Sequence, residues 1–222
     1  MSKNLTVSAS NKDRLFQIGA WSLAVIVSII GYLAWGGDYG YTFSKISGYQ
    51  LFPLLGILAF SIMWSHYVSG TIGEIIGASS SALKRYYQYT GYVVLALICL
   101  HPGILIYSLF RDGKGLPPSS YEHYVAPGLG WITLLGTVSF TIFIAYEFKR
   151  VFADKPWWHF VTEAGDFAML AILYHGLRLG GQLVKPGTWF RDIWWTYFVI
   201  LTAILIRSYY IKYGPRKTLQ QA

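Results

Sequence analysis

The chain has 222 residues, of which 54% are hydrophobic and only 13% are charged, and its formal net charge is +8. A soluble domain normally carries about a quarter charged residues, so the composition argues against a soluble protein and favours an integral membrane protein. The basic residues lie between apolar runs rather than along one stripe, which indicates orientation in a bilayer and not nucleic-acid binding. The single cysteine, Cys99, excludes an internal disulfide and a CxxC metal or redox site.

Six apolar stretches approach the length of about 20 residues that a helix needs to cross a bilayer. They are residues 16–35, 51–70, 86–109, 127–148, 158–180 and 193–213. Turn-forming residues separate them, as in GASSS at 77–81 and DGKGLPPSS at 112–120, and no internal repeat is evident. The sequence therefore predicts an all-α integral membrane bundle of about six transmembrane helices over residues 16–213, with polar tails at 1–15 and 214–222.

Basic residues orient the predicted helices through the positive-inside rule. Twelve lie on the side of the two tails: Lys3, Lys12, Arg14, Lys84, Arg85, Lys149, Arg150, Lys155, Arg207, Lys212, Arg216 and Lys217. Six lie on the other side: Lys45, Arg111, Lys114, Arg178, Lys185 and Arg191. We therefore predict that both termini are cytoplasmic and that the third loop faces outward from the cell membrane. The polar start of the chain precedes a full-length apolar run, so no cleavable signal peptide is expected.

Two histidines lie at matching heights in the predicted bundle. At 1.5 Å per residue, His101 is about 22 Å above the cytoplasmic start of the third span, and His175 is about 25 Å above that of the fifth. Ionisable residues inside membrane helices are costly and are usually functional. Two neutral imidazoles that face each other can supply both axial bonds to a haem iron. His101 and His175 are therefore the predicted metal ligands.

The residues around this pair agree with a haem site. Gly91, Gly103 and Gly176 are small enough for a macrocycle to approach the backbone. Arg178, one turn above His175, can pair with haem propionates near the outer interface. Other interpretations remain: a membrane histidine often serves as an interhelical hydrogen-bond partner, and an arginine at a helix end often extends to the headgroups.

Three further histidines lie elsewhere. His66, in the inner half of the second span, and His159, at the cytoplasmic start of the fifth, can hold a second, inner haem. The alternatives are a packing hydrogen bond for His66 and an interfacial position for His159 beside two tryptophans. His123 lies in the third loop, where it is expected to be solvated and can face an electron acceptor.

Two acidic residues, Glu163 and Asp166, fall inside the fifth span, one turn apart. Acids at such depth usually face the bundle interior or water. They can relay protons, contact a quinone, or cap a helix break at Gly165, and the sequence does not separate these roles.

Two segments, RYYQYTGYVVLALICLHP and WWHFVTEAGDFAMLAILYHGLRLG, resemble the ferric reductase-like transmembrane domain. That superfamily includes ferric reductases, NADPH oxidases and the haem subunit of a periplasmic methionine sulfoxide reductase system. The resemblance implies a helical bundle that holds b-type haem through histidines of the third and fifth spans, here His101 and His175. Gly91, ten residues before His101, fits the third-span pattern, and Trp158 followed later by His175-Gly176-Leu177 fits the fifth.

The chain also departs from this pattern. Two-haem members carry a second histidine lower on each of the two helices, where this chain has Gln88 or Tyr87 and Thr162 or Val161. Either one haem is bound, or His66 and His159 form an unusual second site. We expect no FAD or NAD(P) site in this chain, because no GxGxxG follows the sixth span.

The sequence therefore predicts a membrane cytochrome b. Its haem would carry electrons from a cytoplasmic or quinol donor to an acceptor at the outer face. As part of an oxidoreductase it would be the haem-bearing transmembrane component, with the bilayer and a separate donor protein or quinol as partners. The alternative is a haem-free membrane protein, such as a small transporter or an assembly partner, in which His101 and His175 form a hydrogen-bonded or proton-relay pair. The inverted repeats of many transporters are not visible in the sequence.

Overall fold

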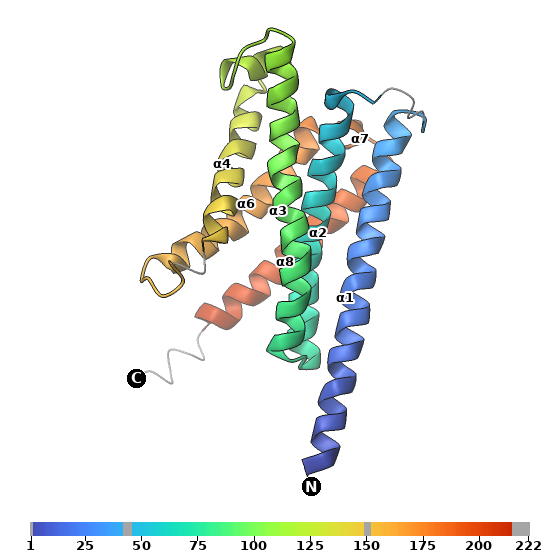
Figure 1. The fold of residues 1–222 in the computed structure, drawn as a ribbon, viewed down its shortest axis with the longest axis vertical. Helices are drawn as coiled ribbons and strands as arrows, with labels where there is room; N and C mark the ends of the chain where they lie inside the picture. Colours follow the sequence, from blue (N-terminus) through green and yellow to red (C-terminus); the bar gives the residue numbers. More distant parts are fainter. Residues whose placement is uncertain (1, 42–45, 149–151, 215–222) are drawn as a thin grey trace.

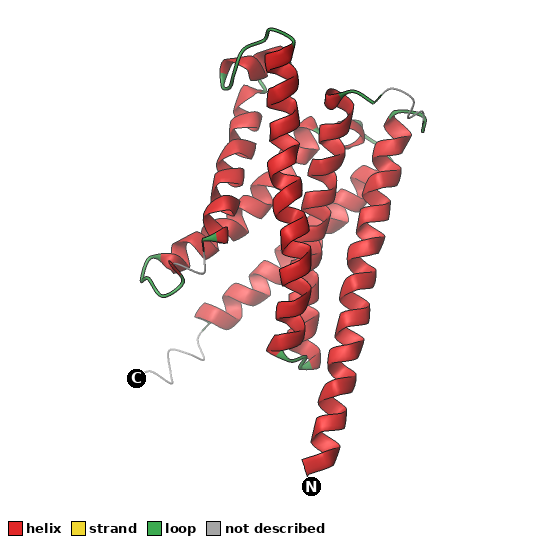
Figure 2. Ribbon diagram, in the orientation of Figure 1, coloured by secondary structure: helices red, strands yellow, loops and turns green. Residues whose placement is uncertain are grey.

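A computed structural model of the chain describes residues 2–41, 46–148 and 152–214, with side chains from residue 11 onward (Figure 1). This part of the chain is helical and contains no strand (Figure 2). The six long helices are α1 (Ser2–Asp38), α2 (Gly48–Ile76), α3 (Ser80–Arg111), α4 (Gly130–Glu147), α6 (Trp158–Leu179) and α8 (Trp189–Tyr213). The short elements are η1 (Ser119–His123) and α7 (Gly181–Val184). The predicted all-α bundle is confirmed.

Five of the long helices, α1, α2, α3, α4 and α8, are long and apolar enough to cross a membrane, within the residues that the structure describes. The sixth, α6, has 22 residues but carries Glu163, Asp166 and Arg178, and it does not reach the same hydropathy. It nevertheless runs between the two ends of the bundle, at a slant to α3 (Figure 1). The molecule thus has the helices of an integral membrane protein, and the long helix that is not among these five carries one of the two matched histidines, His175.

Successive long helices run in alternating directions (Figure 1). As a result, α1 begins and α8 ends at the same end of the bundle, whereas η1 and α7 lie at the opposite end. This arrangement agrees with two tails on one side of the membrane. We refer to the end with η1 and α7 as the outer end, after the predicted orientation, and to the other as the inner end.

The tight connection between α2 and α3 shows how local sequence sets these boundaries. Gly77 ends α2 in the left-handed conformation, with φ of 69°, which glycine adopts without steric cost. Ser79 then caps α3, because its hydroxyl accepts a hydrogen bond from the backbone N–H of Ala82 at 3.2 Å. Asp13 of α1 accepts from the backbone N–H of Ser79 at 2.7 Å, which ties the turn to the first helix.

Aromatic side chains from α2 and α8 form the centre of the core. Trp64 stacks on Tyr197 with ring centroids 4.3 Å apart, and Phe60 packs on Trp194 at 4.4 Å. The indole N–H of Trp194 donates to the carbonyl of Leu173 on α6 at 2.9 Å. The indole N–H of Trp64 donates to the carbonyl of Tyr197 at 3.0 Å. Because both indoles are buried and hydrogen-bonded, these contacts fix α2, α6 and α8 against one another beside the two matched histidines.

Some predictions concern segments that the structure places differently or does not describe. The predicted polar tail at 1–15 is not separate from the first span, because α1 begins at Ser2. Residue 1 and most of the predicted tail at 214–222 lie outside the described residues. So do Lys45, Lys149, Arg150, Arg216, Lys217 and the side chain of Lys3, which are part of the charge count that orients the chain.

Candidate functional site

An apolar cavity of about 420 Å³ lies in the outer half of the bundle. Its walls come mainly from α2, α3, α4 and α6, and a few residues of η1 and the loop after it, and of α7 and α8, complete it. The volume falls within the range of roughly 300–1,000 Å³ that is typical of ligand sites. Both His101 and His175 are among the lining residues.

His101 is held on α3 by a contact with α2. Its Nδ1 lies 2.7 Å from the carbonyl oxygen of Phe52, and a carbonyl can only accept, so Nδ1–H is the donor. The ring also lies directly against Gly56, where an added Cβ would come within 2.7 Å of Cε1 of the imidazole. The absence of a side chain at Gly56 therefore makes room for this imidazole.

His175 is held on α6 by the equivalent contact with α4. Its Nδ1–H donates to the carbonyl oxygen of Ile132 at 2.9 Å. A Cβ at Gly136 would come within 2.8 Å of Cε1 of this ring. The imidazole thus occupies the space that a side chain at Gly136 would take.

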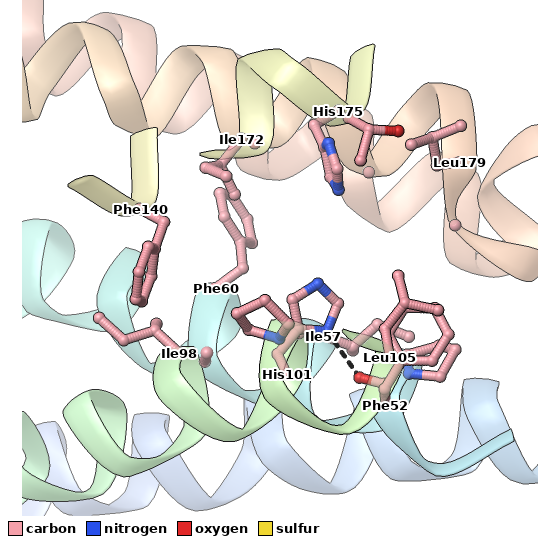
Figure 3. A pocket seen from close by; sticks show the side chains of 18 of the residues that line it. Phe52, Ile57, Phe60, Ile98, His101, Leu105, Phe140, Ile172, His175 and Leu179 are labelled. Carbon is pink, nitrogen blue, oxygen red and sulfur yellow. Dashed lines mark hydrogen bonds between the residues drawn. The ribbon is translucent and has the colours of Figure 1, made fainter. Parts of the chain in front are cut away.

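The two imidazoles extend toward each other across the cavity (Figure 3). A neutral imidazole carries one hydrogen, so with Nδ1 protonated its Nε2 keeps a lone pair. The neutral form is favoured because an imidazolium in an apolar cavity would lose its hydration without a counter-charge. Two nitrogen lone pairs from different helices consequently face the same apolar space.

The rest of the lining is mainly hydrophobic. Phe60, Ile98, Phe140 and Ile172 lie on one side of the two rings, and Leu105 and Leu179 lie on the other (Figure 3). Pro102, next to His101, also lines it. Such a surface accommodates a large, flat, apolar molecule better than a hydrated ion.

The outer loop closes the outer end of the cavity. The ring of Tyr124 packs edge-on against Phe52 at 5.3 Å and stacks on Tyr49 at 5.9 Å, and burial raises the pKa of the Tyr124 hydroxyl to about 12. Tyr49 donates a hydrogen bond to Asp112 at 2.9 Å. Hydrogen bonds from Arg111 and Tyr49 hold the pKa of the Asp112 carboxyl below its ordinary value, so this carboxylate keeps its charge and anchors the loop.

The predicted neighbours of the two histidines occupy different positions. Gly103 and Gly176 line the cavity; Gly103 faces open space, whereas a Cβ at Gly176 would come within 2.8 Å of Trp194. Gly91 faces open space outside the cavity lining. Arg178 is exposed in the last turn of α6 and does not line the cavity. Its pairing with a propionate stays a prediction.

His66 lies in a polar cluster nearer the inner end. Its Nε2 is 2.6 Å from the hydroxyl oxygen of Thr90 on α3, and Tyr86 and Tyr87 pack edge-on against its ring at 5.5 and 5.2 Å. This is the arrangement expected for an interhelical hydrogen bond, the alternative that the sequence left open for His66.

His159 is exposed in the first turn of α6. Its Nδ1 bonds the carbonyl oxygen of Pro156 at 2.6 Å, and its ring lies on Phe160 at 3.8 Å. The described contacts of His159 and His66 do not overlap, so the structure does not bring the two into one site. His123 is exposed in η1, at the outer end.

The two acidic residues of α6 each bond partners on other helices. Asp166 accepts from the hydroxyls of Tyr67 on α2 at 2.9 Å and Tyr209 on α8 at 3.1 Å. Glu163 pairs with Lys212 of α8 at 2.8 Å and accepts a further hydrogen bond from Tyr213. The helix break suggested at Gly165 is wrong, because α6 is continuous from Trp158 to Leu179.

Gly56 and Gly136 are the site residues that reasoning from sequence missed. Each lies on a helix that carries neither His101 nor His175, far in the chain from the ring that it contacts. A signal was present, since both follow two leucines and precede a phenylalanine by four residues, in LLGILAF and LLGTVSF. Because glycines are common in membrane helices, these two did not stand out in the sequence.

No group of three or more His, Cys, Asp and Glu side chains able to hold a metal ion occurs in the described part of the chain. A metal between His101 and His175 would therefore need further ligands from a bound molecule, as a macrocycle supplies. Comparison of the chain with protein-family models, with curated proteins and with solved structures finds no match. The resemblance to the ferric reductase-like transmembrane domain accordingly rests on the residues alone.

Proposed function

We propose that this protein is a membrane cytochrome b of the cell membrane that holds one b-type haem between His101 and His175. The single observation that carries the proposal is the pair of Nε2 atoms facing each other across one apolar cavity (Figure 3). Bis-imidazole ligation needs two such nitrogens on opposite sides of a flat molecule. The haem would supply one-electron chemistry, and the protein would hold it and tune its potential through burial and ligand orientation.

The residues present fit a haem in three respects. The donor set consists of two neutral nitrogens with four coordination positions left to a macrocycle, the lining is apolar, and each imidazole is oriented by a backbone acceptor. Acceptors of this kind fix the tautomer and raise the basicity of metal-bound histidines. In the haem-free alternative, His101 and His175 would form a hydrogen-bonded or proton-relay pair, whereas the hydrogen bond described here for each ring goes to a carbonyl of a neighbouring helix.

The position of the cavity suggests the direction of electron flow. Tyr121 of η1 and Leu183 of α7 line the cavity, and these two elements lie at the end of the bundle opposite the start of α1 and the end of α8 (Figure 1). A haem there would be near an acceptor at the outer face and far from a soluble cytoplasmic donor. We therefore favour a quinol that moves within the bilayer as the donor. A donor protein would need to reach the haem from the side of the membrane.

Optical spectroscopy tests the proposal. The protein is expressed with an adequate haem supply, purified in detergent, and its oxidised and dithionite-reduced spectra are recorded. We expect sharp reduced α and Soret bands and a pyridine haemochrome that corresponds to one haem b per chain. A purified, folded protein without these bands would contradict the proposal.

Electron transfer is tested separately in proteoliposomes. A quinol is added to the bilayer, and an impermeant acceptor is added to the side that exposes η1. Reduction of the acceptor should require His175 and should persist in His159→Ala, because His159 lies outside the cavity. A rate that is unchanged in His175→Ala would contradict electron transfer through this haem.

A further inference from the structure

Two pairs of helices repeat the same short motifs. The pattern Leu-Leu-Gly-x-x-x-Phe occurs at 54–60 in α2 and again at 134–140 in α4. The pattern Ile-x-x-His occurs at 98–101 in α3 and again at 172–175 in α6. α2 packs along α3, and α4 packs along α6. Each hairpin thus carries one copy of both motifs, although they are too short to make an internal repeat evident in the sequence.

Equivalent residues of the two copies make equivalent contacts. In each hairpin, the histidine donates to the carbonyl four residues before the glycine, Phe52 for Gly56 and Ile132 for Gly136. In each, the same ring atoms, Cε1 and then Nδ1, lie nearest to the place of a glycine Cβ. The phenylalanine and isoleucine of both copies line the cavity, as Phe60, Phe140, Ile98 and Ile172 (Figure 3).

Helix geometry explains why glycine is needed at these positions. In an α-helix the carbonyl of residue i accepts from the N–H of residue i+4, so each imidazole shares a carbonyl with the N–H of its glycine. A ring can reach that carbonyl from the side only if no side chain projects from residue i+4. Alanine at either glycine would place Cβ within 3 Å of the imidazole, closer than a packed carbon contact of about 3.5–4.0 Å.

We propose that the α2–α3 and α4–α6 hairpins are two copies of one ligand-presenting unit, in which Gly56 and Gly136 are positioning residues. Each glycine holds its histidine as the Nδ1–H tautomer and directs Nε2 into the shared cavity. α2 and α4 run in the same direction, as do α3 and α6 (Figure 1), and the proposal therefore includes an approximate two-fold relation between the copies about an axis along the bundle.

This arrangement restricts the class of ligand. Two equivalent half-sites present the same donor atom from opposite walls of the cavity, so the ligand must offer the same chemistry on both faces. A planar metal macrocycle with two free axial positions meets this requirement, whereas a ligand with only one coordinating edge would use one half-site. The step from the half-sites to a haem rests on the function proposed above.

The tautomers can be tested on the haem-free wild-type protein. Imidazole ¹⁵N NMR of histidine-labelled protein distinguishes a protonated from a lone-pair nitrogen, and His101→Ala and His175→Ala assign the two signals. We expect both residues to carry hydrogen on Nδ1 and a lone pair on Nε2. Either residue found as the Nε2–H tautomer would overturn the proposal, whether or not the protein binds haem.

Alanine variants of the two glycines test positioning. Gly56→Ala should change the tautomer signal of His101 alone, and Gly136→Ala should change that of His175 alone. Gly19→Ala is the matched control, because Gly19 is an exposed helical glycine of α1 that faces open space and does not line the cavity. Because alanine has a higher helix propensity than glycine, we expect both variants to remain helical, and circular dichroism and gel filtration check this. Unchanged histidine signals in both variants would overturn the positioning role.

Haem titration measures the consequence for the ligand. Each of Gly56→Ala and Gly136→Ala should weaken haem binding by about 10- to 100-fold, as loss of a residue that orients a metal ligand does. Each should also convert the ferric spectrum from low spin toward high spin. Gly19→Ala, outside the cavity lining, should retain wild-type binding. A strong effect in only one of the two variants would overturn the two-fold relation. A wild-type protein that binds no haem would instead overturn the proposed function, while the tautomer measurement still decides the positioning role.

Discussion

The outer and inner regions of this bundle use histidines in opposite ways. In the outer cavity, Nδ1–H of His101 and of His175 donates to a backbone carbonyl, and Nε2 of each ring faces the apolar cavity. In the inner region, His66 bonds Thr90 through Nε2, and Asp166 bonds two tyrosines. Polar groups that satisfy one another fix helices in place, whereas polar groups that point into a shared empty space indicate a ligand.

The largest effect should come from removing either outer ligand. His101→Ala or His175→Ala should reduce the haem content of the purified protein to less than about a tenth of wild type, because one axial bond and its orienting contact are lost. The pyridine haemochrome per chain measures this. His159→Ala, on the same helix as His175 but outside the cavity, is the matched control. Retained stoichiometry in both cavity variants would show that other residues hold the haem.

Removing the inner carboxylate should have a different result. Asp166→Ala deletes an acceptor that joins α2, α6 and α8, and such interhelical bonds contribute about 1–2 kcal/mol in membrane bundles. The free energy of unfolding, measured by denaturation of the haem-free protein in mixed detergent micelles, should fall by that amount, and haem content per folded chain should stay unchanged. In Asp166→Asn, which keeps one acceptor oxygen, the free energy of unfolding should fall less. Haem loss at unchanged stability would place Asp166 in the ligand site instead.

A smaller effect is expected at His66 and Thr90. A double-mutant cycle of His66→Ala and Thr90→Val should give a coupling energy of about 0.6 kcal/mol for this single hydrogen bond. The haem count should remain one per chain in every variant of the cycle. A count that falls from two to one in His66→Ala would reveal the inner haem that the sequence left open.

The smallest effect is predicted at the edge of the cavity. Cys99, the single cysteine of the chain, is exposed and also lines the cavity. Alkylation of the detergent-solubilised protein by a small maleimide should be modestly slower with haem than without it, because the macrocycle would cover part of the approach. Mass spectrometry of timed samples measures the rate. Equal rates would indicate that the haem does not extend toward this wall.

The fold could be predicted because its signals are local. Apolar runs bounded by turn formers indicate helices, and the six predicted stretches each lie within or close to one long helix. The first helix differs most: it extends through the predicted tail to Ser2, since polar residues such as those at 2–15 do not by themselves end a helix. GGDYG at 36–40 does coincide with its end.

The site could be predicted only in part, because its parts have different physical origins. The heights of His101 and His175 follow from helix rise alone, and the structure brings the two residues to one cavity. The carbonyls of Phe52 and Ile132 and the glycines that expose them depend on how neighbouring helices rotate and tilt. The partners of Glu163 and Asp166 lie on α2 and α8, far away in the chain, so counting along α6 did not identify them.

Binding of one haem by two neutral imidazoles can be examined through the electron paramagnetic resonance spectrum of the oxidised protein. We expect a low-spin ferric signal that corresponds to one haem per chain and that turns high-spin or disappears in both His101→Ala and His175→Ala. A high-spin signal in the wild type, a low-spin signal that survives both substitutions, or a folded protein without haem would contradict it.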